Sequence, residues 1–358
     1  MQAFFENLVQ LFLQAVFSSL DTAVRIDYTE MWKGRFLLLS RKSPRRENQM
    51  AISNTMRAAL HALSYPAEID ADKTYRLERA FKSLSTPLSP LYHLWDHRIE
   101  REGREIRVRI YTPPKVADGR LLLFFHGGGW VLENIDTYNS VCRSLARYTG
   151  CRVASVEYGL APEHLFPVGL EDCYAAAREV YLHPEDFGVQ SHEITLIGDS
   201  AGGNLAAAVS LMARDRGEFT VSQQILIYPA TYNDHTPESR FDSVRENGYD
   251  YLLTAKRVQD YMAMYAGCDP RLVTSPYFAP LLSSDLSRQP RTLVITAEFD
   301  PLRDEGEEYA YALARAGAEV VLHRMPDALH GYFSLPSRFP LVRRTYSILC
   351  QFLNGEQS

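Results

Sequence analysis

The chain has 358 residues, with 38 basic and 44 acidic side chains, and carries a formal net charge of -6 at pH 7. No long run of basic residues occurs, which argues against nucleic acid as the main partner and leaves small neutral substrates as the expected ligands. A chain of this length can bury a large core, so we expect one large α/β domain with an accessory cap rather than two equal domains.

The cysteines favour a reducing compartment. They are odd in number, widely spaced and without a C-x-x-C pair, which predicts neither a disulfide framework nor a zinc site. The five positions are Cys142, Cys151, Cys173, Cys268 and Cys350. We expect a cytoplasmic protein without a bound metal.

Residues 4–20 place apolar side chains about every four positions, with polar residues such as Glu6 and Gln10 between them. This spacing predicts an amphipathic helix rather than a membrane span, and the stretch has neither the basic start nor the small-residue cleavage site of a secretory signal. We expect the helix to pack on the body of the protein, without stable insertion into a membrane. A lid or a membrane-surface helix is the alternative.

The remaining chain alternates between predicted helices and strands. Helices are expected first, at 50–63 and 72–84, and a hairpin of two strands follows at 92–100 and 105–111. Further strands are expected at 120–125, 152–157, 193–197, 224–228, 292–296 and 320–323, and further helices at 138–148, 168–181, 204–214, 254–265, 305–316 and 341–352. Such alternation with right-handed crossovers predicts one mostly parallel sheet with helices on both faces. Residues 233–275 interrupt it with a polar, tyrosine-rich stretch, which we interpret as an insertion.

The sequence GDSAGG at 198–203 lies between a predicted strand and a predicted helix. The spacing Gly198-x-Ser200-x-Gly202 provides small residues on both sides of a sharp turn, as in the nucleophile elbow that holds a serine hydroxyl above a sheet edge. Because this spacing also occurs in ordinary turns, the interpretation depends on what accompanies it.

A serine hydroxyl needs a base in order to attack at neutral pH, and the base needs an orienting carboxylate. Asp300 follows the predicted strand at 292–296, and His330 follows the next strand. The order Ser, Asp, His, each after a parallel strand, is that of α/β-hydrolases. Asp304 competes with Asp300, but it is better placed to serve the start of the following helix.

Three consecutive glycines follow a predicted strand, in the sequence HGGGW at 126–130. Consecutive glycines let the backbone approach a ligand closely. We expect an oxyanion hole made by the N–H groups of Gly127 and Gly128, together with that of Ala201 after the nucleophile. His126 is expected to orient the loop by hydrogen bonding and not to act as a base.

With HGGGW, GDSAGG, AEFDPL and ALHGYF, the chain resembles the bacterial branch of the hormone-sensitive-lipase-like carboxylesterases over roughly residues 90–355. The resemblance implies an α/β-hydrolase fold, with a mostly parallel eight-stranded sheet flanked by helices and a helical cap. It implies no metal or organic cofactor. It also implies that Ser200 is the nucleophile, that His330 is the general base and then the acid, and that Asp300 orients the histidine.

By the same resemblance the chain divides into four segments. A helical cap segment at 1–88 precedes the first part of the α/β-hydrolase core at 89–232, and a cap insertion at 233–275 precedes the second part of the core at 276–358. Many relatives form a homodimer through the last strand and the terminal helix, and residues 319–352 allow one here.

Two positions depart from the family pattern. Gly159 replaces the arginine of the segment EYGLAPE, so any ion pair that this arginine makes is missing. Glu133 stands where a small residue is usual after the glycine loop.

These features predict a serine carboxylesterase that hydrolyses small short-acyl esters through an acyl-enzyme intermediate. Trp130, Tyr249 and Tyr251 are candidates for the wall of its substrate pocket, although aromatic residues in a cap are more often its core. An amidase, a formamidase or a deacetylase of an acetylated small molecule would use the same three residues. A non-catalytic small-molecule receptor is a more distant alternative, which the presence of His330 disfavours.

Overall fold

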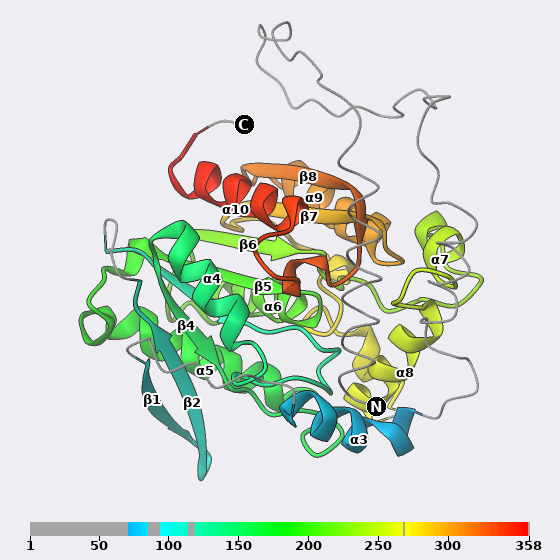
Figure 1. Ribbon diagram of the computed structural model, residues 1–358, viewed down its shortest axis with the longest axis horizontal. Helices are drawn as coiled ribbons and strands as arrows, with labels where there is room; N and C mark the ends of the chain where they lie inside the picture. Colours follow the sequence, from blue (N-terminus) through cyan, green and yellow to red (C-terminus); the bar gives the residue numbers. More distant parts are fainter. Residues whose placement is uncertain (1–70, 85–93, 114–118, 268, 357–358) are drawn as a thin grey trace, which may run out of the picture. The chain divides into compact units, whose positions relative to one another are not determined.

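The computed structural model describes residues 71–84, 94–113, 119–267 and 269–356 (Figure 1). The helices predicted at 4–20 and 50–63 lie outside the described residues, and so does Cys268. The described residues all belong to one unit that comprises residues 63–358. The division into core and cap segments stays a prediction.

Eight strands form one sheet. They are β1 (Leu94–Arg101), β2 (Arg104–Tyr111), β3 (Leu121–Phe125), β4 (Arg152–Val156), β5 (Ile194–Asp199), β6 (Gln223–Ile227), β7 (Arg291–Phe299) and β8 (Val320–Leu329). Their order is β1-β2-β4-β3-β5-β6-β7-β8, in which β1 with β2 and β2 with β4 are antiparallel and all other neighbours are parallel. The predicted fold class is confirmed.

Helices flank this sheet. The α-helices are α3 (Ala71–Leu84), α4 (Asn139–Thr149), α5 (Val168–Leu182), α6 (Ala201–Arg216), α7 (Asp242–Asn247), α8 (Ala255–Ala266), α9 (Arg303–Arg315) and α10 (Pro340–Leu353). Short 3-10 helices occur at Pro184–Phe187, Ser191–Glu193, Leu272–Thr274, Pro280–Leu282 and Tyr332–Ser334. Within the described parts of the chain, no helix has the length and apolar character needed to cross a membrane.

Strand β3 shows that both faces of the sheet are covered. Leu121, Leu123 and Phe125 join the core that includes side chains of α5, α6 and α9. Leu122 and Phe124 join a second core, which includes side chains of α4 and α10. Side chains alternate between the two faces of a strand, so a strand covered on both faces has to be apolar throughout. This explains the uninterrupted run LLLFF.

Strands β7 and β8 both extend further than the sequence predicts. A register shift between Ala297 and Phe299 interrupts their pairing, which then resumes with Phe299 opposite Leu329. Asp300 is the first residue after β7, and His330 is the first residue after β8. The last pair of the ladder therefore brings these two residues to neighbouring positions at the carboxyl edge of the sheet.

Two arginines of the hairpin supply positive charge next to Gly159. Arg101 Nη1 donates to Asp172 Oδ1 at 3.1 Å, and Arg104 Nη2 donates to Asp172 Oδ2 at 2.8 Å. The Gly159 N–H donates to the same carboxylate at 2.9 Å. A Cβ atom at Gly159 would lie 2.7 Å from Arg104 Nη2, so a larger side chain has no room unless that arginine moves. Although Gly159 itself carries no charge, arginines from the hairpin therefore form ion pairs beside it.

We predict that Asp172→Asn lowers the free energy of unfolding by about 3 kcal/mol, because Asp172 is fully buried and its loss removes the carboxylate that two partly buried guanidinium groups share. Urea unfolding measures this. The matched control is Glu105→Gln, which removes the partner of Arg98 in an exposed ion pair and should cost less than about 1 kcal/mol. Equal losses in the two variants would contradict a structural role for the buried cluster.

Candidate active site

Ser200 lies in the turn between β5 and α6, with φ 57° and ψ −122°. A positive φ is unfavourable for a residue that has a Cβ atom, so the surrounding structure has to maintain it. The Ser200 N–H donates to the carbonyl oxygen of Ile227 at 2.9 Å, which fixes the turn against β6. The serine therefore occupies the strained strand-to-helix turn that the sequence predicts.

Two glycines of this turn have no room for a side chain. A Cβ atom at Gly198 would lie 2.2 Å from the carbonyl oxygen of Gly202. A Cβ atom at Gly202 would lie 2.0 Å from the carbonyl oxygen of Phe125, at the end of β3. Backbone thus packs directly on backbone where β3, β5 and α6 meet.

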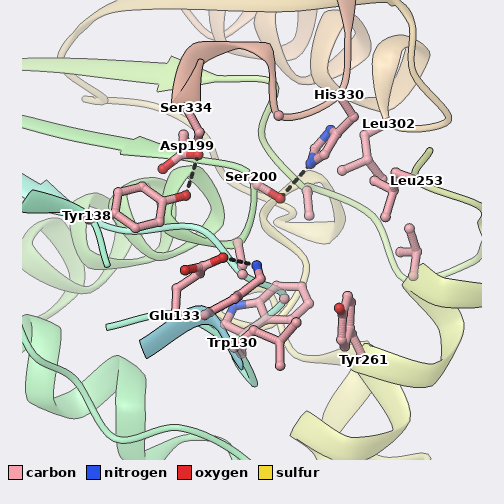
Figure 2. Close-up of a pocket in the computed structure, with 18 residues that line it drawn as sticks. Trp130, Glu133, Tyr138, Asp199, Ser200, Leu253, Tyr261, Leu302, His330 and Ser334 are labelled. Carbon is pink, nitrogen blue, oxygen red and sulfur yellow. Dashed lines mark hydrogen bonds and ion pairs between the residues drawn. The ribbon is translucent and has the colours of Figure 1, made fainter. Parts of the chain in front are cut away.

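His330 connects Ser200 to Asp300. His330 Nε2 lies 2.8 Å from Ser200 Oγ (Figure 2), and His330 Nδ1 lies 2.7 Å from Asp300 Oδ2. Asp300 is fully buried, and its other carboxylate oxygen accepts the N–H of Leu302 at 2.9 Å. The structure therefore brings the three predicted residues together in one chain of hydrogen bonds.

Asp304 is not part of this chain of hydrogen bonds. Its Oδ2 accepts the N–H of Ser243 at 2.7 Å, and its Oδ1 accepts from Arg303 Nε at 2.8 Å. Asp304 lies in the first turn of α9, but the amide that its carboxylate accepts belongs to α7, so these contacts join the two helices and do not cap α9 as the sequence suggests.

The glycine loop lies beside the pocket, but one of its predicted oxyanion donors is engaged elsewhere. The Gly127 N–H donates to Asp199 Oδ1 at 3.0 Å, and Asp199 is buried. The prediction that Gly127 is an oxyanion donor is therefore wrong, because its hydrogen atom is directed at a buried carboxylate. Gly128, Gly129 and Ala201 line the pocket.

Asp199 ties the glycine loop to the sheet. Besides the Gly127 N–H, its carboxylate accepts hydrogen bonds from the hydroxyls of Tyr138 at 3.0 Å and Tyr228 at 3.3 Å. Burial raises the pKa of Asp199 to about 6, against the lowering effect of these hydrogen bonds and of His330. The sequence analysis missed this residue; its place next to the serine was the available signal.

His126 supports the loop from inside the protein. Its Nδ1 lies 2.8 Å from the carbonyl oxygen of Gly127, and its ring stacks on Tyr158 with the ring centroids 4.4 Å apart. Burial lowers the pKa of His126 to about 4, so the ring is neutral near pH 7. The prediction that His126 orients the loop is confirmed.

A cavity of about 300 Å³ opens over Ser200 and has two chemically different sides (Figure 2). The apolar side is formed by Leu253, Tyr261 and Leu302. The polar side is formed by Glu133, Tyr138, Asp199 and Ser334, and Lys82 also lines the cavity. The other lining residues are Gly128, Gly129, Trp130, Leu132, Ala201, Ala230, Val258, His330 and Gly331.

One of the three predicted aromatic wall residues lines the pocket and two do not. Trp130 is in the wall. Tyr249 is 59% exposed, and Tyr251 is buried against Phe299 with the ring centroids 5.1 Å apart. The predictions for these two tyrosines are wrong, because one side chain is exposed to solvent, the other packs on Phe299, and neither lines the pocket. Tyr261, on α8, lines the pocket instead.

The polar side contains an ion pair that the sequence analysis did not predict. Glu133, which departs from the family pattern, pairs with Lys82 of α3. The two residues are far apart in the chain, and Lys82 lies in an ordinary amphipathic helix. No motif could therefore have identified Lys82.

The chemistry available here is that of a hydroxyl, an imidazole and a buried carboxylate in series, which suits the activation of an oxygen nucleophile. Over the described part of the chain, no group of three or more His, Cys, Asp or Glu side chains is arranged to hold a metal ion.

Comparison with known proteins agrees with this chemistry. A family model described as an alpha/beta hydrolase fold matches residues 122–334. An arylesterase of Saccharolobus solfataricus is 36% identical over 252 residues, which cover 70% of this chain and 81% of the relative. An ethyl acetate hydrolase of Pseudomonas putida is 34% identical over 241 residues, which cover 66% of this chain and 74% of the relative.

The fold is also shared with solved esterases. A hyperthermophilic esterase from the archaeon Pyrobaculum calidifontis superimposes with a TM-score of 0.76 at 36% sequence identity, covering 86% of this chain and 99% of that one. The motifs, the sheet order and these similarities lead to the same conclusion. The chain belongs to the hormone-sensitive-lipase-like carboxylesterases of the α/β-hydrolase superfamily.

Proposed function

We propose that this protein hydrolyses small short-acyl esters, with Ser200 as the nucleophile, His330 as the general base and then acid, and Asp300 as the orienting carboxylate. The observation that carries this proposal is the unbroken series of short contacts from Ser200 Oγ through both ring nitrogens of His330 to Asp300, at the wall of a pocket. Removal of the Ser200 hydroxyl tests it.

The reaction proceeds in two steps. Ser200 Oγ attacks the ester carbonyl carbon while its proton passes to His330 Nε2, and the bond to the alcohol oxygen breaks as Nε2 returns that proton to the leaving oxygen. Water, activated by the same nitrogen, then attacks the acyl-enzyme, which releases the acid and restores the hydroxyl. Asp300 holds the imidazole in orientation and stabilises its protonated form.

The oxyanion hole is assigned to the N–H groups of Gly128, Gly129 and Ala201. Gly129 replaces Gly127 in this set, because the Gly127 N–H is already bonded to Asp199 whereas Gly128 and Gly129 line the pocket. Preorganised donors of this kind stabilise the charge that develops on the carbonyl oxygen, and each contributes about 3 kcal/mol to the lowering of the barrier.

The size of the pocket supports a small substrate. About 300 Å³ is at the lower end of the range for small-molecule sites. One relative is named as an ethyl acetate hydrolase, and its named substrate is a small short-acyl ester.

We predict that Ser200→Ala lowers kcat for p-nitrophenyl butyrate by about 10⁴-fold or more while the far-UV circular dichroism spectrum is unchanged. Asp300→Asn should lose a similar factor, because His330 would then lack its orienting acceptor. Asp304→Asn is the matched control, with an expected loss below about 10-fold since Asp304 makes no contact with His330. Turnover retained by Ser200→Ala would refute the proposed mechanism.

Acyl-chain length is a separate prediction. A series of p-nitrophenyl esters from acetate to palmitate, with the matching anilides, should show the highest kcat/KM at acetate or butyrate, because the pocket is small. Faster cleavage of palmitate than of butyrate would contradict the short-acyl preference. Faster cleavage of the anilides would favour the amidase alternative.

Asp199 generates a prediction about pH. Its pKa is about 6 in the folded protein against an ordinary value of 3.8, so the folded state binds more protons than the unfolded state between these values. The contribution of Asp199 to stability therefore falls as the pH rises from about 4 to about 6. The unfolding free energy of the wild type minus that of Asp199→Asn, from urea titrations across this range, should fall accordingly. A constant or rising difference would contradict the assignment.

A further inference from the structure

The polar side of the pocket has a chemistry that hydrolysis of a simple alkyl ester does not require. Leu253, Tyr261 and Leu302 already provide an apolar wall for alkyl groups on one side of Ser200 (Figure 2). On the opposite side, the dashed contact from Glu133 in Figure 2 marks its ion pair with Lys82.

Glu133 has an unfavourable backbone conformation. Its φ is +68°, in the left-handed region that disfavours residues with a Cβ atom. Its Cγ atom packs against the glycine loop, since a Cβ atom at Gly128 would lie 2.8 Å from it. Strained non-glycine residues of this kind persist where the surrounding structure determines them, and they cluster at functional sites. Trp130 and Ser200, which line the same pocket, also have positive φ.

Lys82 is held in position through its helix. Arg79, on the same helix, donates from Nε to the carbonyl oxygen of Val131 at 2.6 Å. Glu78 forms an ion pair with Arg257 of α8, and α3 and α8 lie side by side (Figure 1). The helix that carries Lys82 is therefore anchored to the glycine loop and to α8, and Glu133 holds the ammonium group itself.

The ion pair is only partly exposed, with 15% of the Glu133 side chain and 40% of the Lys82 side chain accessible. An alkyl chain laid over it would remove its remaining water without replacing the lost hydrogen bonds, which is unfavourable. A substrate oxygen at the same place would accept a charge-assisted hydrogen bond from the ammonium group.

On the basis of the proposed esterase function, we propose that Lys82, held by Glu133, forms a subsite for an uncharged oxygen acceptor, so that the enzyme prefers esters bearing an ether, hydroxyl or carbonyl oxygen over alkyl esters of equal length. The acceptor is uncharged because the ammonium group is already paired with Glu133 and is under the influence of two further carboxylates, Glu78 and Asp199, against one further cation, Arg257. A further carboxylate on the substrate would meet this negative surface.

The test uses two pairs of substrates that differ only by exchange of CH₂ for oxygen. One pair, 2-methoxyethyl acetate and butyl acetate, probes the alcohol branch of the ester. The other, p-nitrophenyl methoxyacetate and p-nitrophenyl butyrate, probes the acyl branch. The ratio of kcat/KM for ether over alkyl ester is compared between the wild type and each variant, so that the intrinsic reactivity of the substrates cancels.

In Lys82→Met, the ether-to-alkyl ratio should fall about tenfold for at least one pair, as expected for the loss of one hydrogen bond to a charged group. Glu133→Gly should lower the ratio too, because the ammonium group loses the carboxylate that holds it. This second variant tests the proposal even if Lys82→Met does not fold, since glycine adopts φ +68° without strain. Lys256→Met is the matched control: it makes the same substitution in another ion pair, that of Lys256 with Asp260 on α8, outside the pocket lining, and should leave the ratio unchanged.

A ratio within twofold of the wild type for both pairs in Lys82→Met and Glu133→Gly would overturn the inference while leaving the esterase function intact. Absence of hydrolysis of all four esters by the wild type would instead refute the proposed function.

The pH dependence of the same ratio gives a second readout. Desolvation lowers the pKa of Lys82 to about 8, with Glu78 and Asp199 raising it and Arg257 lowering it further. The ether-to-alkyl ratio of the wild type should therefore fall as the pH rises through about 8, when the ammonium group loses its proton. In Lys82→Met this change around pH 8 should be lost, because the ammonium group that makes the proposed contact is gone. A pH-independent wild-type ratio would count against the subsite.

Discussion

Direct contact between backbone segments at the Ser200 turn is the constraint on which the site depends. The carbonyl oxygens of Gly202 and Phe125 occupy the space that side chains at positions 198 and 202 would need. Strands β3 and β5 are neighbours and parallel, so the glycine loop after β3 and the serine after β5 emerge at the same edge of the sheet. Tight packing at this edge therefore sets the distance between the nucleophile and the loop proposed to stabilise the oxyanion.

The same edge is completed by the last two strands. The pairing of Phe299 with Leu329, after a register shift, places Asp300 beside His330. Pro326 lies within β8, and a proline there favours the prediction of a shorter strand. Because β8 is at the edge of the sheet, one of its sides has no neighbouring strand, and the proline is tolerated. The contact between Asp300 and His330 thus depends on a strand end that the local sequence does not predict.

The charged groups around this site have two kinds of environment. Asp300 and Asp199 are satisfied by hydrogen bonds from the histidine, the tyrosines and the glycine loop, which makes them part of the active-site framework. The Lys82–Glu133 pair instead lies at the surface of the pocket, where a substrate would displace its water. As we propose, the first arrangement supports catalysis and the second selects the substrate.

By itself, the sequence determined the order of strands and helices along the chain and the mostly parallel sheet, because periodicity is a local property. It also predicted that Ser200, Asp300 and His330 lie close together, because each follows a strand and parallel strands end at one edge of the sheet. Only the tertiary structure decided that the Gly127 N–H is bonded to Asp199, since the direction of an N–H depends on loop dihedral angles and on a buried acceptor. It also decided that Tyr261 lines the pocket, since the rotation of a helix about its axis is set by packing against the rest of the protein.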